Sequence, residues 1–261
     1  MANEIVKIHN DLTNEKLGKM NAKELDLFMS ICHKMRDKGT ERVTIDFKDL
    51  RRLGNFSQTS NKVLAKEIIS ANEKLLEFKV LIKNGPKTKQ RTLFKEFETD
   101  EEALTVSCEV WEETAYILND IASHFTRFEL SEFVSLDSKY AKRLYKLIKQ
   151  YRTQGTFYIT KEDFYKALDV PSTYTNTNYN KKVLRPALEE CKRYIPSLEC
   201  VPKKSGRGGA VRGYTFNFSI EVPPKKTPSK TSVGKKVNNR FNDFEQRQLD
   251  FDDIEQIILS N

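Results

Sequence analysis

The sequence predicts an α+β chain in which one structural unit occurs twice, followed by a tail of different composition. Two segments of about 60 residues share the same order of helical and β-prone patterns. The last helices of these segments match at a constant offset of 120 residues. The chain has 261 residues, which is enough for two domains at roughly 150 residues per domain. A repeat at so long a period indicates duplicated domains rather than a solenoid.

The first unit runs from Asn21 to Phe78, and each of its elements follows from local spacing. The pattern predicts, in order, a helix over 25–35 that ends at Gly39, a strand over 42–45, a helix over 47–53, a turn over 55–60, and a helix whose buried side is Leu64, Ile68, Ala71 and Leu75.

The second unit runs from Ser138 to Ile195 and repeats that order. It predicts a helix over 140–151 that ends at Gly155, a strand over 156–160, a helix over 161–168, a turn over 171–177, and a helix whose buried side is Leu184, Leu188, Cys191 and Ile195. Both last helices place their apolar residues at i, i+4, i+7 and i+11, so we expect equivalent surroundings for Leu64 and Leu184.

Each unit ends in β-prone runs around a polar turn. In the first unit the turn is 84–90, and a further strand over 104–108 is expected to join that sheet. In the second unit the turn is the Gly-rich stretch 203–209. Helix, strand, helix, turn, helix and hairpin is the order of a winged-helix domain, and the hairpin tip is its wing. We therefore predict two tandem winged-helix domains, each with a helix-turn-helix and a β-hairpin wing.

The predicted organisation has four parts. They are an N-terminal winged-helix domain over 1–110, a connector helix over 111–126, a C-terminal winged-helix domain over 127–222, and a tail over 223–261. The connector is predicted from the apolar stripe of Trp111, Ala115, Leu118, Ile121 and Phe125.

Positive charge is concentrated in the second unit. The chain carries a formal net charge of +8, and residues 176–213 hold nine basic and three acidic side chains, a net +6. A concentrated basic patch is typical of a protein that binds a polyanion, although solvated basic helices are also common. Two winged-helix domains in tandem, with the charge on the second, favour double-stranded DNA as the partner.

In a helix-turn-helix the last helix lies in the major groove, with its N-terminal part against the base edges. Lys and Arg donate to guanine and Asn pairs with adenine, whereas wing residues mostly position the protein on the backbone. If both domains bind together, they should contact faces about one turn (~34 Å) apart. Pro186 either kinks the second helix or marks its first turn. The candidate DNA-binding residues are Gln58, Ser60, Asn61, Lys62, Lys66, Lys87, Lys89, Arg91, Asn178, Lys181, Lys182, Arg185, Arg193, Lys203, Lys204, Arg207 and Arg212.

Several classes of protein are excluded. No run approaches the ~18 consecutive apolar residues of a membrane span, and the N-terminus lacks an export signal, so we expect a cytoplasmic protein with four reduced cysteines. The cysteines are too scattered for a zinc site, and no P-loop motif is present. A nicking enzyme would need a metal-binding histidine pair beside a tyrosine, and His9, His33 and His124 are far apart. We therefore predict a protein that is not an enzyme and has no cofactor or metal.

Three stretches carry a resemblance to a known family: Phe125 to Leu130, Ser138 to Lys149, and Val183 to Glu190. They resemble the core signature of theta-type plasmid replication initiators of the RepB/RepE kind, over about Met1 to Val222. The resemblance implies an initiator that binds direct repeats, called iterons, at a plasmid origin as a monomer and helps to open the duplex.

The resemblance also implies a homodimer, in equilibrium with the monomer, that represses its own promoter. In that family the first domain usually carries dimerisation, and the second dominates the contact with iterons. Host DnaA and the replicative helicase are implied partners. A transcriptional repressor without initiator activity is the first alternative, and a rolling-circle nicking enzyme is the second.

The tail departs from this pattern. Residues 223–239 are rich in Pro, Lys and Ser and are predicted to form a disordered linker. An acidic amphipathic helix is predicted from Asp250 to Leu259. It is either a docking peptide for a partner or a helix that folds back on its own domain.

Overall fold

The computed structural model describes residues 4–14, 17, 20–119, 121, 123–206 and 209–221. The predicted tail over 223–261 lies outside the described residues.

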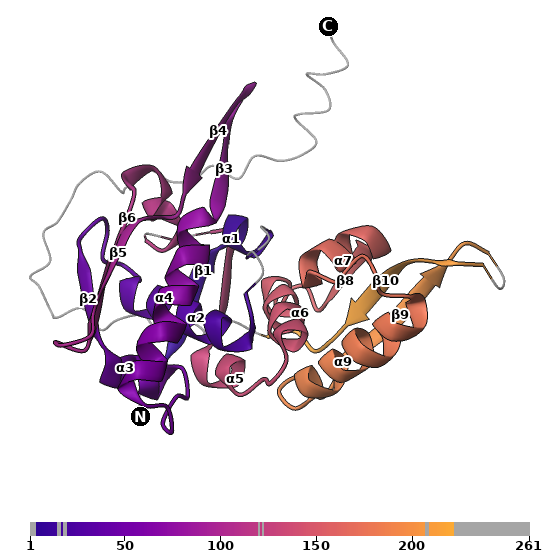
Figure 1. The fold of residues 1–261 in the computed structure, drawn as a ribbon. Coiled ribbons are helices and arrows are strands. Elements are labelled where there is room, and N and C mark those ends of the chain that lie inside the picture. Colours follow the sequence, from indigo (N-terminus) through magenta and orange to yellow (C-terminus); the bar gives the residue numbers. More distant parts are fainter. Residues whose placement is uncertain are drawn as a thin grey trace, which may run out of the picture. The chain divides into compact units, whose positions relative to one another are not determined.

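The elements up to residue 117 are β1 (Ile5–His9), α1 (Asn10–Asn14), α2 (Ala22–Met35), β2 (Val43–Asp46), α3 (Phe47–Leu53), α4 (Asn61–Glu77), β3 (Lys79–Asn84), β4 (Lys87–Thr92), β5 (Phe94–Asp100), β6 (Thr105–Val110) and the 3₁₀ helix η1 (Glu112–Ile117). The elements after it are β7 (Phe125–Glu129), α5 (Leu130–Val134), α6 (Lys139–Gln150), β8 (Thr156–Thr160), α7 (Lys161–Leu168), α8 (Asn176–Tyr179), the π-helix η2 (Asn180–Leu184), α9 (Arg185–Lys192), β9 (Glu199–Lys204) and β10 (Val211–Asn217) (Figure 1).

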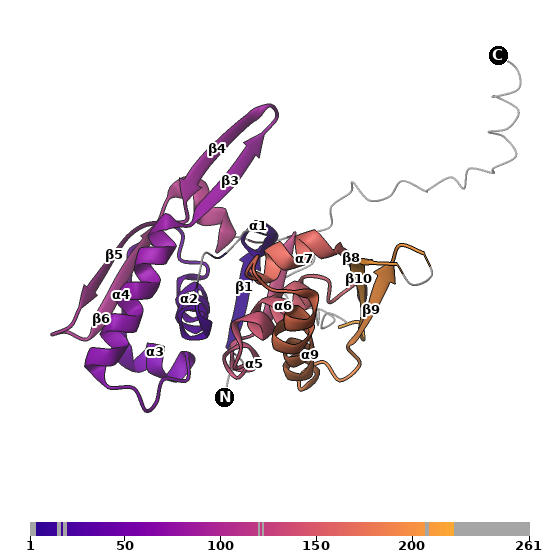
Figure 2. The same cartoon turned by 45° about the vertical axis from the view of Figure 1, so that its right-hand side comes forward.

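The first predicted three-helix unit is present as α2, α3 and α4. Helix α2 begins with a capping box, in which the Asn21 side chain accepts from the Glu24 N–H and the Glu24 carboxylate accepts from the Asn21 N–H. Helix α4 lies along the sheet formed by β2, β6 and β5 (Figure 2). Its predicted buried side is confirmed, because Leu64, Ile68, Ala71 and Leu75 are fully buried.

The wing of the first domain differs from the prediction. The strands around 84–90 form a two-stranded hairpin, β3–β4, that projects on its own (Figure 1). The three-stranded sheet has the order β2-β6-β5, which matches the order β8-β10-β9 of the second domain. The counterpart of the second wing is therefore the β5–β6 hairpin, and β3–β4 is an additional hairpin before it. Strand β6, expected as an extra strand, is central because it pairs with both β2 and β5.

The predicted connector helix over 111–126 is wrong. Among the described residues of this region only η1 is helical, and the chain then forms β7, which pairs antiparallel with β1 from the N-terminus. Phe128 lies opposite Val6, and the side chains of Thr126, Phe128 and Leu130 are buried at alternate positions. The strand forms because its buried residues alternate and β1 supplies the hydrogen-bonding partner.

The second three-helix unit consists of α6, α7 and the continuous helical segment 176–192, packed on the sheet β8-β10-β9. Its core is aromatic: Phe157 stacks on Phe216 with ring centroids 4.9 Å apart, and Phe164 meets Phe216 edge-on at 5.2 Å. Gly155 ends the turn after α6 with φ +72°, as Gly39 does after α2 with φ +62°. A Cβ at Gly155 would lie 2.9 Å from the carbonyl oxygen of Phe218, so glycine is required there.

The helical segment 176–192, called here the second recognition helix, contains a wide turn. The Arg185 N–H donates to the Asn180 carbonyl, five residues back, and Pro186 lies in the first turn of α9. Proline has no N–H and clashes with the carbonyl four residues before it, and the π-turn accommodates both effects. Pro186 therefore sits at the start of α9, immediately after the π-turn.

The wide turn also changes which side of this helix is buried. Residues four apart stay on one face, so Tyr179, Val183, Ala187 and Cys191 are all fully buried. Leu184 and Leu188, predicted to be buried, are only half-buried, so the expected equivalence of Leu64 and Leu184 is not found. The prediction assumed regular α-helical spacing, which the π-turn breaks.

The structure shows the state of the cysteines and the character of the helices within the described part of the chain. Cys32, Cys108 and Cys191 are buried, Cys200 is half-buried, and all four are free. Within the described residues, no helix has the length and apolar character to cross a bilayer.

Candidate nucleic-acid interface

The second recognition helix begins at a well-defined cap. The Thr175 hydroxyl accepts from the Asn178 N–H at 3.3 Å, and the Lys161 ammonium on α7 donates to the Asn176 Oδ1 at 2.8 Å. The cap satisfies one of the free N–H groups of the first turn. These contacts fix the N-terminal end of the helix, which is the end that enters the major groove in helix-turn-helix proteins.

The predicted cations of this helix are exposed. Lys181, Lys182 and Arg185 are exposed and form no ion pair with the described residues; Lys182 lies 5.8 Å from the Tyr174 ring centroid. Arg193, just beyond the helix, has its guanidinium 3.7 Å from the Asp137 carboxylate. Exposed, unneutralised cations in this position suit contacts with base edges and phosphates.

The predicted residues of the second wing lie on its two strands. Lys203 and Lys204 on β9 and Arg212 on β10 are exposed, and none forms an ion pair with the described residues. The ladder between β9 and β10 shifts between Val211 and Gly213, which places Arg212 in a bulge. Arg207, also predicted here, lies outside the described residues.

The first recognition helix, α4, offers less free charge. Lys62 and Lys66 are exposed and form no ion pair with the described residues. Ser60 caps the helix by accepting from the Val63 N–H at 3.4 Å, and Asn61 accepts a hydrogen bond from Arg51. Gln58 is exposed in the preceding turn. Arg51, which holds Asn61, was missed by the sequence analysis because it lies on α3.

The basic residues of the β3–β4 hairpin are partly neutralised. The Lys89 ammonium lies 2.8 Å and the Arg91 guanidinium 3.3 Å from the Glu113 carboxylate, whose pKa the Lys89 hydrogen bond lowers. Arg91 also lies 4.6 Å above the Trp111 ring. Only Lys87 of the three predicted residues is exposed without such a partner among the described residues. Contact between this hairpin and DNA stays a prediction, and its topology gives no support for a wing.

The remaining predicted residue, Asn178, is half-buried, and the structure does not place its side chain toward any described partner. Between Leu184, Leu188 and the charged residues around them the helix surface forms a hollow of about 410 Å³. Among the described residues, no group of three or more His, Cys, Asp or Glu side chains is placed to hold a metal ion.

Comparison with known proteins gives consistent matches. Residues 5–149 match the family model described as "Initiator Replication protein, WH1", and residues 160–218 match "Initiator Rep protein, WH2". A "Probable replication protein rep" from Bifidobacterium longum (strain NCC 2705) is 38% identical over 227 residues, which cover 86% of this chain and 75% of the relative.

Among solved structures, the fold is similar to that of the Pi initiator protein in complex with iteron DNA. The TM-score is 0.66 at 13% sequence identity, over 85% of this chain and 99% of the other. At this identity the likeness concerns the fold. It supports the arrangement of two winged-helix domains in one chain.

Proposed function

The chain belongs to the family of initiator replication proteins with WH1 and WH2 domains, and from this premise we propose that it binds repeated double-stranded sequences at a plasmid origin and helps to open the duplex there. Family membership supports the role in initiation. The Pi initiator, whose fold is similar, was solved bound to iteron DNA, and this supports origin repeats as the class of site.

One observation carries the DNA-binding part of the proposal. On the second recognition helix and the two strands of its wing, six of the predicted DNA-binding cations are exposed and form no ion pair with the described residues: Lys181, Lys182, Arg185, Lys203, Lys204 and Arg212. Cations elsewhere on the surface are frequently paired, as Arg42 is with Glu96 and Glu98. Solubility alone does not require these six cations to lack acidic partners. Neutralisation of DNA phosphates does require cations that are free to contact them.

The two domains are proposed to divide the work. The second contributes most of the affinity because it carries the free charge. The first contributes α4 as a weaker reader and carries the contact between two copies in a dimer, which represses the promoter of its own gene. Host DnaA and the replicative helicase are the proposed partners during opening. We also propose a cytoplasmic location, where these partners would meet the protein.

Opening distinguishes an initiator from a repressor. We expect the protein, added to a supercoiled plasmid carrying its cognate repeats, to make thymines beside the repeats reactive to permanganate, because unpaired thymines lose the shielding of the stack. The Lys182→Ala, Arg185→Ala double variant serves as the control. It should neither protect the repeats from nuclease digestion nor make thymines reactive. Protection of the repeats without reactive thymines would favour the repressor alternative.

The protein is further proposed to act without a covalent step on DNA. No catalytic arrangement of residues is predicted from the sequence, and the matching family is described by initiation rather than by cleavage. Incubation of the protein with supercoiled plasmid and a divalent metal should leave the plasmid supercoiled. Relaxed circles that carry protein at a 5′ end would instead support the nicking alternative.

A further inference from the structure

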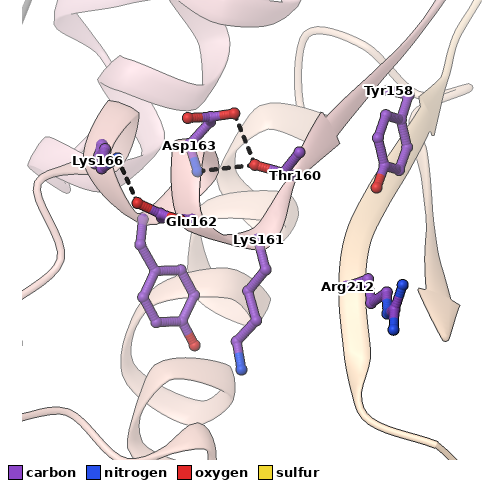
Figure 3. A pocket seen from close by; sticks show the side chains of 8 residues that line it. Tyr158, Thr160, Lys161, Glu162, Asp163, Lys166 and Arg212 are labelled. Carbon is purple, nitrogen blue, oxygen red and sulfur yellow. Dashed lines mark hydrogen bonds and ion pairs between the residues drawn. The ribbon is translucent and has the colours of Figure 1, made fainter. Parts of the chain in front are cut away.

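An open hollow of about 700 Å³ lies beside the second recognition helix and was not anticipated from the sequence. Its walls are the end of β8 with Tyr158, the N-terminal half of α7 with Lys161, and Arg212 of the wing (Figure 3). Because Lys161 also donates to Asn176, the hollow directly adjoins the N-terminal end of the recognition helix. It therefore occupies the space between the two parts of the domain that are proposed to bind DNA.

Tyr158 is an exposed aromatic residue on β8. It lies on the face of the sheet opposite the aromatic core, directly across from Thr215, and is 55% exposed. A Cβ at Gly213 would lie 2.5 Å from the Ile159 carbonyl oxygen, which requires glycine there, and 2.5 Å from the Tyr158 Oη, whose ring therefore lies over this glycine. The absence of a side chain at Gly213 thus lets the Tyr158 ring lie against the strand and leave its other side open to solvent.

The acidic residues that line the hollow have partners of their own on α7 or at its start. Glu162 is ion-paired with Lys166 at 2.5 Å, and the Asp163 carboxylate accepts from the Thr160 hydroxyl at 2.7 Å and forms no ion pair with the described residues. Figure 3 shows the Lys161 side chain on the α7 side and the Arg212 guanidinium on the facing strand, with the Asp163 carboxylate turned away from the Lys161 ammonium. Arg212 forms no ion pair with the described residues. One side of the hollow is therefore suited to an anion.

We propose that this hollow receives the sugar–phosphate backbone of the duplex whose major groove holds the second recognition helix. A phosphate lies between Lys161 and Arg212, and the neighbouring deoxyribose packs on the open face of Tyr158. This inference rests on the proposed function, since it requires duplex binding by that helix. It adds Tyr158 and Lys161 to the interface as residues that position the DNA and do not read its sequence.

The backbone of a duplex fits these features better than a single strand does. Sites for single strands use several aromatic rings on which successive bases stack. Here the second aromatic wall, Tyr165, is half-buried and packs against Tyr179 with centroids 4.3 Å apart, so its ring is not free for a base. One open ring beside two cations matches a single deoxyribose next to its phosphate.

The test uses the full-length protein and measures Kd for a cognate repeat and for a random duplex over a series of salt concentrations. Lys161→Gln removes the charge but keeps a donor for Asn176, and Arg212→Ala removes the second cation. Each should weaken binding to both duplexes by the same factor and make the slope of log K against log[salt] less steep by about 0.9. Tyr158→Ala should weaken both duplexes about threefold to tenfold with the slope unchanged, and Tyr158→Phe should bind as the parent does.

Lys38→Ala, which removes an exposed cation in the turn after α2 that forms no ion pair with the described residues, is the matched control and should bind as the parent does. Three results would overturn the inference: equal affinity of all hollow variants and the parent for both duplexes, loss confined to the cognate repeat, or loss of binding to a dT oligonucleotide with duplex binding unchanged. Failure of the proposed function would differ, because the parent protein itself would not prefer the repeat to random DNA.

Discussion

Replacing Lys142 with methionine should lower the free energy of unfolding by about 3–5 kcal/mol, because it leaves a carboxylate buried without its partner. The Lys142 ammonium on α6 lies 2.6 Å from the Asp26 carboxylate on α2, and both side chains are buried. The same ammonium donates to the carbonyl oxygens of Phe133 at 2.9 Å and Val134 at 3.3 Å. The pair joins the two three-helix units.

The pH dependence of this variant has a definite sign. Burial raises the pKa of Asp26 to about 7, even with Lys142 present, and burial lowers the pKa of Lys142. Without the lysine, the folded protein should bind a proton on Asp26 that the unfolded chain releases near pH 4. Stability of the Lys142→Met variant should therefore fall as pH rises from about 4 towards neutral.

Urea unfolding followed by circular dichroism measures both effects. The double variant Asp26→Leu, Lys142→Met removes the two charges together and should recover most of the loss, since an apolar pair of similar volume can replace a buried ion pair. A single variant as stable as the parent, or a double variant less stable than the single one, would show that the pair is not what holds the units together.

Replacing Lys146 with methionine should have the opposite effect and stabilise the protein by a few kcal/mol at pH 7. The Lys146 side chain is buried, and its ammonium has only the Leu12 carbonyl oxygen, at 3.5 Å, as a hydrogen-bond partner among the described residues. Burial, reinforced by the charge of Arg143, lowers its pKa to about 7. Keeping this lysine charged in the folded state at neutral pH therefore costs a few kcal/mol, at about 1.4 kcal/mol for each tenfold change in its proton affinity.

The sign of the pH effect follows from proton binding. Between pH 7 and about 10.5 the unfolded chain holds a proton on this lysine that the folded protein does not. Stability of the parent should therefore rise with pH across that window, and Lys146→Met should remove the rise. Guanidinium unfolding at pH 7 and pH 9.5 tests this. Parallel changes in the two proteins would mean that Lys146 is solvated in the folded state.

These two lysines also mark what local sequence patterns could not predict. Lys142, Lys146 and Lys149 recur along one side of α6, and such a stripe is typical of a solvated face. In the structure this side is buried, partly against α2 of the other unit and partly against α1. A contact made by residues more than a hundred positions apart leaves no trace in the spacing of one helix.

The helical cores were predictable for the opposite reason. The buried sides of α2 and α4 follow from apolar residues three and four apart, and the fixed offset of 120 transfers the same order to α6, α7 and the second recognition helix. Strand pairing was harder. Strand β2 pairs with β6, about 60 residues later, so the sequence could not decide which hairpin extends the sheet.

Some properties of the candidate DNA-binding residues could be predicted from local spacing, and others depend on distant parts of the chain. Exposure was predicted for Lys182 on the face opposite the apolar seam and for Lys181 and Arg185 on its flanks, and all three are exposed. The π-turn moves only the first half of that seam, from Leu184 and Leu188 to Val183 and Ala187. The pairing of Lys89 and Arg91 with Glu113 could not be foreseen, because the acidic residue lies beyond two further strands. No sequence pattern pointed to a role for Tyr158 in DNA binding. Its ring lies over Gly213, which belongs to another strand, so its position could not be predicted from its own strand.

The central claim is that the second recognition helix reads bases while its wing holds the backbone. Affinities of Lys182→Ala, Arg185→Ala and Lys204→Ala for the cognate repeat and for random duplex DNA test it most directly. Lys182→Ala and Arg185→Ala should each weaken the cognate complex by about 1–3 kcal/mol more than the random one, and Lys204→Ala should weaken both complexes equally. Equal losses on both DNAs for all three variants would contradict the claim.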